Sequence, residues 1–211
     1  MKITRLVRNV HNTEKIAIYI DSKYTFSVLE SILASESLYV GKDITQSEID
    51  DLKNLGEYKL LKQKVLKLIS LRPRSEAEIR TYLQKKTTED MMQRLINELV
   101  ETKEIDDEAF AKWWRDQRRT FTNKSAFEIN IELRKKGLSQ ESTRASNYDP
   151  NEELNEVNAA KELIKKKNNA LQHKNYEKNV LEMKVKTFLQ RKGFSWDTIN
   201  QAMSEIEDEK V

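Results

Sequence analysis

Three consecutive acids, Asp106, Asp107 and Glu108, could ligate a metal ion. Carboxylate oxygens are the ligands that hard cations such as Mg²⁺ take, and a bound Mg²⁺ would suit a nuclease. Acids at the start of an amphipathic segment more often cap a helix, because their oxygens accept hydrogen bonds from free N–H groups and their charge is favourable at the positive end of the helix dipole. We therefore interpret these acids as a helix start and predict no metal site.

The sequence offers little material for other catalytic chemistry. His11 and His173 lie far apart in the chain, which argues against a Ser–His nucleophile and against a His-based metal site. The absence of Cys excludes disulfides, thiolate zinc sites and a Cys nucleophile, and favours a reducing, cytoplasmic location. The four glycines are too scattered to form a phosphate-binding loop. The sequence thus predicts a protein with no enzyme activity, catalytic residues or cofactor.

Clusters of basic side chains are the best functional candidates. The formal net charge is only +3, but basic residues outnumber acidic ones over residues 57–147, whereas residues 1–56 are nearly balanced. Lys and Arg at helix ends also complement the helix dipole, and this alternative is as compatible with the sequence as a binding face. The candidates for contacts with phosphate or acidic side chains are Arg72, Arg74, Lys85, Lys86, Arg115, Arg118, Arg119, Lys124, Arg134, Lys135, Lys136, Lys165, Lys166, Lys167, Arg191 and Lys192.

An internal repeat places several of these clusters at equivalent positions. Residues 74–86, 124–137 and 181–193 align on Lys86, Lys136 and Lys192. Each copy then has two apolar residues four apart: Ile79 and Leu83, Ile129 and Leu133, and Val185 and Leu189. Such a pair followed by a basic cluster predicts an amphipathic helix that ends in positive charge.

The first two copies also share a predicted capping box. Ser75 can accept a hydrogen bond from the backbone N–H of Glu78, and the Glu78 side chain can reach back; Ser125 and Glu128 repeat this arrangement. The third copy lacks the box, because Leu181 and Lys184 occupy these positions.

Glycine is placed at the predicted helix ends in only two copies. Gly137 and Gly193 follow the basic clusters of the second and third copies, where a helix would end in a left-handed turn. The first copy has Thr87 instead, so its turn must be built differently.

We predict a mainly α-helical fold of tandem three-helix repeats, preceded by a small α/β module with a β-hairpin. The module spans residues 1–55, and Gly56 is expected to break its last helix, which begins at a Thr45 capping box. The hairpin comes from two alternating runs, residues 16–20 and 24–28. The predicted repeats are residues 57–105, 106–147 and 155–207, with a Pro-containing linker at 146–155 between the last two.

The repeats resemble the RecX family of bacterial recombinase regulators. The residues that carry the resemblance are Arg74-Ser75-x-x-Glu78 with Ile79 and Leu83, then Ile105-Asp106-Asp107-x-x-Phe110-Ala111-x-x-Trp114 with Arg118, and Ile129-x-x-Glu132-Leu133-x-x-Lys136-Gly137. The resemblance covers about residues 57–207. It implies a curved array of three-helix units that binds in the groove of a RecA–DNA filament and inhibits strand exchange, ATP hydrolysis and co-protease activity.

Partners and location follow partly from this resemblance. It implies a monomer that contacts the RecA filament and the backbone of single- or double-stranded DNA. The sequence shows no signal peptide and no apolar stretch long enough to span a membrane. Two other classes stay open: a helix-turn-helix protein that reads DNA bases, and a structural adaptor for an acidic protein partner. Residues 88–102, a helix that could read bases, carry mostly acids and apolar residues.

Overall fold

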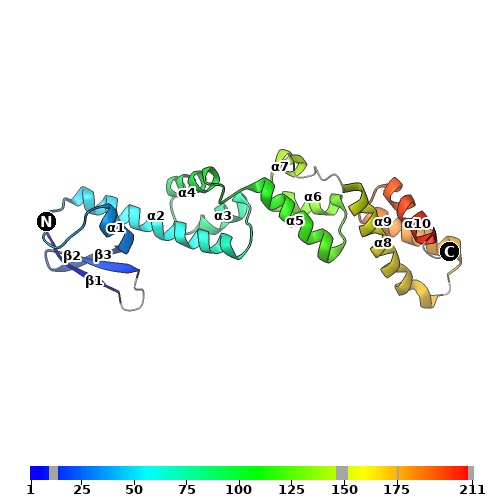
Figure 1. The fold of residues 1–211 in the computed structure, drawn as a ribbon, viewed down its shortest axis with the longest axis horizontal. Coiled ribbons are helices and arrows are strands. Elements are labelled where there is room, and N and C mark those ends of the chain that lie inside the picture. Colours follow the sequence, from blue (N-terminus) through cyan, green and yellow to red (C-terminus); the bar gives the residue numbers. More distant parts are fainter. Residues whose placement is uncertain (10–13, 146–151, 175, 209–211) are drawn as a thin grey trace. The chain divides into compact units, whose positions relative to one another are not determined.

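The computed structural model describes residues 1–9, 14–145, 152–174 and 176–208 (Figure 1). The run His11-Asn12-Thr13, which suggests a turn after a first strand, and most of the predicted linker at 146–155 therefore lie outside the described residues. In chain order the elements are β1 (Ile3–Arg8), β2 (Lys15–Ile20), β3 (Lys23–Leu29), α1 (Glu30–Ser35), α2 (Gln46–Leu71), α3 (Glu76–Leu83), α4 (Glu89–Glu101), α5 (Asp107–Thr122), α6 (Ala126–Lys135), α7 (Gln140–Ala145), α8 (Glu152–Leu171), the short 3-10 helix η1 (Gln172–Lys174), α9 (Lys178–Arg191) and α10 (Trp196–Asp208). The fold is mainly helical, as predicted.

The N-terminal strands form an antiparallel sheet in the order β1-β2-β3. The predicted hairpin is confirmed: Ile18 pairs with Phe26, and the connecting residues Asp21 and Ser22 both have positive φ, as the tight turns of hairpins require. Ile18 and Val28 are completely buried on one face of the sheet, in a core that α1 and α2 complete. The module is thus held together by one apolar sheet face.

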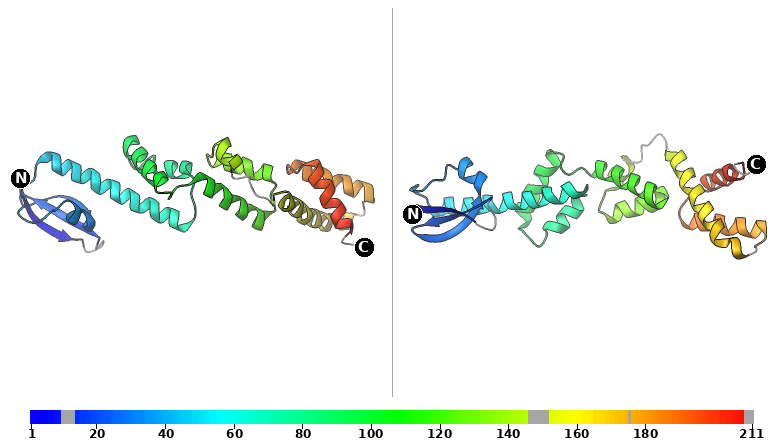
Figure 2. Two further views of the ribbon diagram at one scale, coloured as in Figure 1. Left: turned by 45° about the horizontal axis from the view of Figure 1, so that its top comes forward. Right: turned by 60° about the horizontal axis from the view of Figure 1, so that its bottom comes forward.

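Helix α2 continues through Gly56, so the predicted break there is wrong. It starts at Thr45 with a complete capping box and runs without interruption to Leu71 (Figures 1 and 2). Gly56 is buried beside the sheet, where an added Cβ would lie 3.5 Å from Val28 Cγ1. A glycine inside a helix costs about 1 kcal/mol relative to Ala, and packing against the sheet offsets this cost. The helix therefore crosses the predicted boundary between the module and the first repeat.

The contacts divide the chain into two compact units, the first of which is Met1–Arg72 with Thr87–Leu99. In this unit α4 is joined to α2 by polar contacts: the Tyr58 hydroxyl donates to Glu98, and Lys62 Nζ lies 2.6 Å from Glu98 Oε1. Burial and the Glu98 carboxylate raise the pKa of Tyr58 to about 12, so its hydroxyl remains a donor. The buried face of α4 consists of Met92, Leu95, Ile96 and Leu99.

The second unit contains Pro73–Lys86 and the chain from Val100 onward. All six residues of the repeated apolar pairs are at most 1% exposed, which confirms the predicted stripe: Ile79, Leu83, Ile129, Leu133, Val185 and Leu189. Separate apolar clusters surround Leu133 and Leu189. The three-helix pattern is therefore present, while the exact residue limits of each repeat stay a prediction.

A joint of three polar and steric contacts, built on the Ser75 cap, connects α3 to the end of α6. Ser75 Oγ accepts from the Glu78 N–H at 3.2 Å and donates to the Lys136 carbonyl at 2.8 Å. Lys136 Nζ in turn lies 2.6 Å from Glu78 Oε1. Gly137 has φ +85°, and a Cβ there would lie 2.2 Å from Ala77 Cβ. The Ser half of the predicted box is confirmed, but Glu78 uses its carboxylate to bind the next repeat.

The same joint recurs between α6 and the end of α9. Ser125 Oγ accepts from the Glu128 N–H at 3.2 Å and donates to the Lys192 carbonyl at 2.6 Å, while Lys192 Nζ lies 3.2 Å from Glu128 Oε1. Gly193 has φ +84°, and a Cβ there would lie 2.5 Å from the Phe127 ring. The two joints use the same residue types at the same offsets, so the repeat extends to the contacts between repeats.

A carboxylate from the N-terminal part of another helix, α5 or α8, completes each joint. Asp107 Oδ1 accepts from the backbone N–H of Glu76 at 2.9 Å, and Glu156 accepts from that of Ala126. Glu76 and Ala126 are the first residues of α3 and α6, where a free N–H needs an acceptor. Burial raises the pKa of the Asp107 carboxyl, although the Glu76 N–H opposes this change.

Candidate binding surface

Two of the three acids at 106–108, Asp106 and Asp107, accept hydrogen bonds from the N-termini of helices. Asp106 is the N-cap of α5 and accepts from the N–H groups of Glu108 and Ala109, each at 2.9 Å, which confirms the cap interpretation. Asp107 bonds the start of α3 as described above. Within the described residues, no group of three or more His, Cys, Asp or Glu side chains is arranged to hold a metal ion.

One predicted binding residue, Arg115, is buried. It is only 2% exposed, and its guanidinium donates to Asn130 and to the Thr143 carbonyl, the latter at 3.1 Å. These bonds connect α5 to α6 and α7. Arg115 therefore stabilises the second repeat and is not available to a partner, which corrects its assignment to a binding face.

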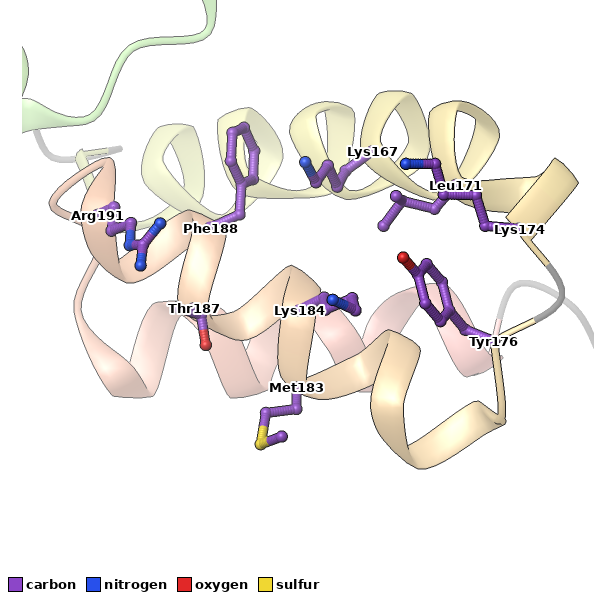
Figure 3. A pocket seen from close by; sticks show the side chains of 9 residues that line it. All are labelled: Lys167, Leu171, Lys174, Tyr176, Met183, Lys184, Thr187, Phe188 and Arg191. Atoms are coloured by element: carbon purple, nitrogen blue, oxygen red, sulfur yellow. The ribbon is translucent and has the colours of Figure 1, made fainter.

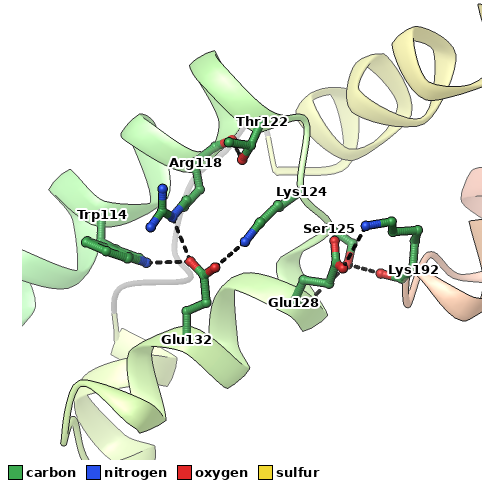
Figure 4. Close-up of polar contacts among 8 residues, drawn as sticks. All are labelled: Trp114, Arg118, Thr122, Lys124, Ser125, Glu128, Glu132 and Lys192. Carbon is green, nitrogen blue, oxygen red and sulfur yellow. Dashed lines mark hydrogen bonds and ion pairs between the residues drawn. The ribbon is translucent and has the colours of Figure 1, made fainter. Parts of the chain in front are cut away.

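Two other predicted residues, Arg118 and Lys124, converge on a single carboxylate in the second repeat (Figure 4). Glu132 accepts from Arg118 Nε at 2.7 Å, from Trp114 Nε1 at 2.9 Å and from Lys124. The Arg118 guanidinium also lies 4.1 Å from the centre of the Trp114 ring. Both cations are partly neutralised within the chain and contribute less to a binding surface than their charge suggested. Arg118 joins α5 to α6, and Lys124 joins the connection between these helices to α6.

The Glu132 cluster should make the second repeat sensitive to acid. Although burial favours the neutral form, bonds from Lys124, Arg118 and Trp114 hold the pKa of Glu132 below its usual 4.5. A carboxyl whose pKa is lower in the folded state stabilises the fold above the unfolded pKa and loses this effect as the pH falls through the folded value. We expect Glu132→Gln to lower the free energy of unfolding most near about pH 7, with the difference from wild type shrinking below about pH 4.5.

Urea unfolding at several pH values, followed by tryptophan fluorescence, measures this difference. Glu104→Gln, at an exposed side chain, controls for the loss of one negative charge. A difference between wild type and Glu132→Gln that stayed constant from about pH 7 down to about pH 3 would contradict the stabilising role of the ionised carboxylate.

Several of the remaining candidates also have partners inside the chain. Lys136 and Lys192 belong to the joints. Arg74 lies 3.9 Å from Glu78, and Lys165 lies 3.9 Å from Glu162. The Lys86 ammonium lies 3.4 Å from the centre of the Tyr82 ring. Arg72 and Arg119 are half-buried.

The exposed basic candidates fall into three places. They are Lys85 and Lys86 after α3, Arg134 and Lys135 at the end of α6, and Lys165, Lys166 and Arg191 on α8 and α9; Lys167 is half-buried on α8. The structure thus separates the predicted cations into exposed groups and groups used to connect helices.

Helix α6 also exposes apolar side chains that the sequence analysis missed. Phe127 is 57% exposed and Ile131 is 36% exposed. Together with Arg134 and Lys135 they lie at helical spacings of three and four residues, so they share one face, which we call the α6 surface. The sequence signal for this face is that Phe127 and Ile131 are apolar but do not lie on the buried helix face of Ile129 and Leu133. An exposed apolar face with a basic end is typical of a protein-binding surface.

None of the described helices combines the length and the hydropathy needed to cross a bilayer.

Comparison with known proteins supports the fold across nearly the whole chain. Models described as "Regulatory protein RecX N-terminal domain", "RecX, first three-helix domain" and "RecX, third three-helix domain" match residues 1–45, 62–99 and 155–203. A crystal structure of regulatory protein RecX superposes with a TM-score of 0.76 at 23% identity, covering 96% of this chain and 98% of the other. RecX from Lactobacillus salivarius gives a TM-score of 0.64 at 22% identity, covering 72% of this chain and 97% of the other.

Curated relatives show the family at higher identity. Regulatory protein RecX of Listeria monocytogenes serotype 4a (strain HCC23) is 33% identical over 212 residues, which cover 99% of this chain and 77% of the relative. Regulatory protein RecX of Bacillus pumilus is 30% identical over 210 residues, covering 98% of this chain and 78% of the relative. These matches include the N-terminal module as well as the helical repeats. The chain therefore belongs to the RecX family of regulatory proteins.

Proposed function

We propose that this chain binds the RecA–DNA filament and inhibits the recombinase, ATPase and co-protease activities of RecA without itself being an enzyme. The observation that carries the proposal is membership of a family of regulatory proteins along nearly the whole chain. In this proposal the protein is a cytoplasmic monomer that acts by occupying a surface. It contacts RecA directly and DNA mainly through the phosphate backbone.

The structure suggests how repeats could act together on a filament. Each exposed ion pair contributes only about 0.2–1 kcal/mol, so useful affinity requires several contacts at once. Linked repeats supply such contacts, because binding of one raises the effective concentration of the next. The joints fix neighbouring second helices to one another, which reduces the freedom lost on binding. The α6 surface provides apolar contact area and two exposed cations for an acidic patch on RecA or for phosphate.

Of the two alternative functions from the sequence, the helix-turn-helix reader is less well supported. A helix-turn-helix reader needs polar and basic side chains on a reading helix. Helix α4 has one basic residue, Arg94, whose guanidinium lies over the Tyr58 ring at 4.7 Å. A structural adaptor for an acidic protein would use the α6 surface equally well, and the partner used in the binding experiment decides between the two.

Parallel titrations test the proposal. Labelled protein is titrated with single-stranded DNA, with RecA alone, and with RecA assembled on single-stranded DNA in the presence of a non-hydrolysable nucleotide. We expect the filament to bind most tightly, since it alone presents protein and phosphate contacts together. Equal affinity for free DNA and filament would favour a DNA-binding protein, and binding to neither RecA form would contradict the proposal.

A further inference from the structure

A groove between α8 and α9 in the third repeat has no role in the joints (Figure 3). It has a volume of about 460 Å³, within the usual range of ligand sites. Lys167 and Leu171 line it from α8, Lys184 and Phe188 line it from α9, and Tyr176 closes one end with its ring between the helices. The groove thus combines cations with aromatic rings along the length of a helix pair.

Among the described residues that line the groove, all the charged side chains are positive. Its lining contains four cations, Lys167, Lys174, Lys184 and Arg191, and no carboxylate. Other lysines of α9 do have acidic partners: Lys186 Nζ lies 2.5 Å from Glu182, and Lys178 Nζ lies 3.3 Å from Glu207. Cations without nearby carboxylates attract an anionic ligand, because no ion pair within the groove has to be broken.

The two aromatic rings indicate which class of anion the groove suits. Tyr176 is 37% exposed, and Lys184 Nζ lies 4.7 Å from the centre of its ring; Lys167 Nζ lies 4.9 Å from the centre of the Phe188 ring. Each ring is therefore paired with a cation. Unpaired nucleobases stack on aromatic side chains while their phosphates bind cations, and a duplex offers no free base faces. An acidic peptide would use the cations but would leave the rings unused.

We propose that the groove between α8 and α9 binds a short single-stranded segment of nucleic acid, with phosphates on Lys174, Lys184 and Arg191 and a base stacked on Tyr176. The residues of α9 that line the groove extend from Met183 to Arg191, about 12 Å along the helix axis, which is long enough for a few nucleotides. This proposal rests on the regulatory function proposed above and adds a contact with bases to the expected backbone contacts. In a filament it would place the third repeat on exposed single strand.

Fluorescence polarisation of a labelled oligothymidylate with the full chain, in the absence of RecA, tests the groove. For single strands the logarithm of the binding constant falls with the logarithm of salt concentration by about 0.7 per phosphate contacted. Lys184→Ala/Arg191→Ala should therefore reduce the salt slope by about 1.4. The control Lys64→Ala/Lys67→Ala removes two exposed cations of α2, which are not in the groove lining, and should leave the slope near the wild-type value.

A second pair of variants tests stacking. Tyr176→Ala should weaken oligothymidylate binding about 5- to 150-fold, since stacking of one base contributes about 1–3 kcal/mol, whereas Tyr176→Phe keeps the ring and should bind as wild type does. A matched duplex and a polyglutamate peptide are used as competitors. The proposal is wrong if Tyr176→Ala binds oligothymidylate as wild type does, or if the duplex binds as tightly as the single strand. It is also wrong if the peptide displaces the oligonucleotide while Lys184→Ala/Arg191→Ala leaves the salt slope of oligothymidylate binding unchanged.

The test of the groove can fail independently of the test of the proposed regulatory function. If the wild-type chain inhibits RecA but the groove variants bind oligothymidylate normally, the proposed nucleic-acid site in the groove is wrong and the regulatory function is supported. If the groove variants lose oligothymidylate binding but the wild-type chain has no effect on RecA, the nucleic-acid site is supported and the regulatory function is wrong.

Discussion

Gly137→Ala is expected to lower the free energy of unfolding of the second unit by about 2–5 kcal/mol. About 1–2 kcal/mol comes from forcing a residue with a Cβ into the left-handed conformation at φ +85°. A further 1–3 kcal/mol, roughly, comes from overpacking, since the new Cβ would lie 2.2 Å from Ala77 Cβ. The substitution should therefore separate the end of α6 from the start of α3.

Urea unfolding measures the effect, with far-UV circular dichroism for the whole chain and tryptophan fluorescence for the second unit, which holds all three Trp residues. Gly41→Ala is the control for backbone strain, because Gly41 has φ +101° but no described atom within 4 Å of an added Cβ; it lies in the first unit, so its effect is followed by circular dichroism. It should cost only about 1–2 kcal/mol. Equal losses at Gly41 and Gly137 would show that the steric contact with Ala77 is unimportant.

Ala77→Gly provides a rescue. It removes the atom that the new Cβ would strike, so in the Gly137→Ala background it should recover the steric part of the loss. On its own it should destabilise, because Gly in a helix costs about 1 kcal/mol relative to Ala. Additive effects of the two substitutions on the free energy of unfolding would contradict the close contact between positions 137 and 77.

The sequence predicted the parts of this joint but not their partners. The Ser caps, the apolar pairs and the left-handed glycines are local features with fixed spacings, and the structure confirms each of them. Whether Glu78 bonds its own helix or Lys136 depends on which helices meet, and spacing within one helix does not contain that information. The carboxylate of Glu78 contacts a residue 58 positions away.

The joint also explains the departures in the outer copies. In each joint the Ser and Glu of one copy bond the Lys-Gly turn at the end of the next copy. The Ser–Glu pair is therefore needed only in a copy that bonds such a turn, and the glycine only in a copy whose own turn is bonded. Copy three has Leu181 and Lys184 instead of the pair, and α9 begins earlier, at Lys178, without a side-chain cap. Copy one follows the N-terminal module and has Thr87 instead of glycine.

Predictions from residue type alone were weakest where tertiary contacts decide the outcome. Gly56 suggested a helix end, but burial beside the sheet keeps α2 continuous. Arg115 and Arg118 suggested a binding face, but one is buried and the other bonds Glu132. A basic side chain has the same appearance in a sequence whether its partner is a carboxylate of the same chain or a phosphate.

Inhibition of RecA depends, in this account, on exposed cations and not on those used within the fold. Arg134→Glu/Lys135→Glu reverses two exposed charges on the α6 surface. Because each such contact contributes about 0.2–1 kcal/mol and reversal adds repulsion, the concentration needed for half-inhibition should rise on the order of tenfold. The control Lys64→Glu/Lys67→Glu reverses two exposed charges on α2 and should inhibit as wild type does.

The most direct test of the regulatory function is the rate of DNA-dependent ATP hydrolysis by RecA at increasing concentrations of the wild-type chain. We predict that the rate falls to a small fraction of its starting value, that the chain alone hydrolyses neither ATP nor DNA, and that the α6 variant requires more protein for the same effect. Asp106→Ala should lower stability before it lowers inhibition, because Asp106 caps α5. An unchanged RecA rate at saturating wild-type protein, or a metal-dependent nuclease activity lost in a folded Asp106→Ala variant, would contradict the account.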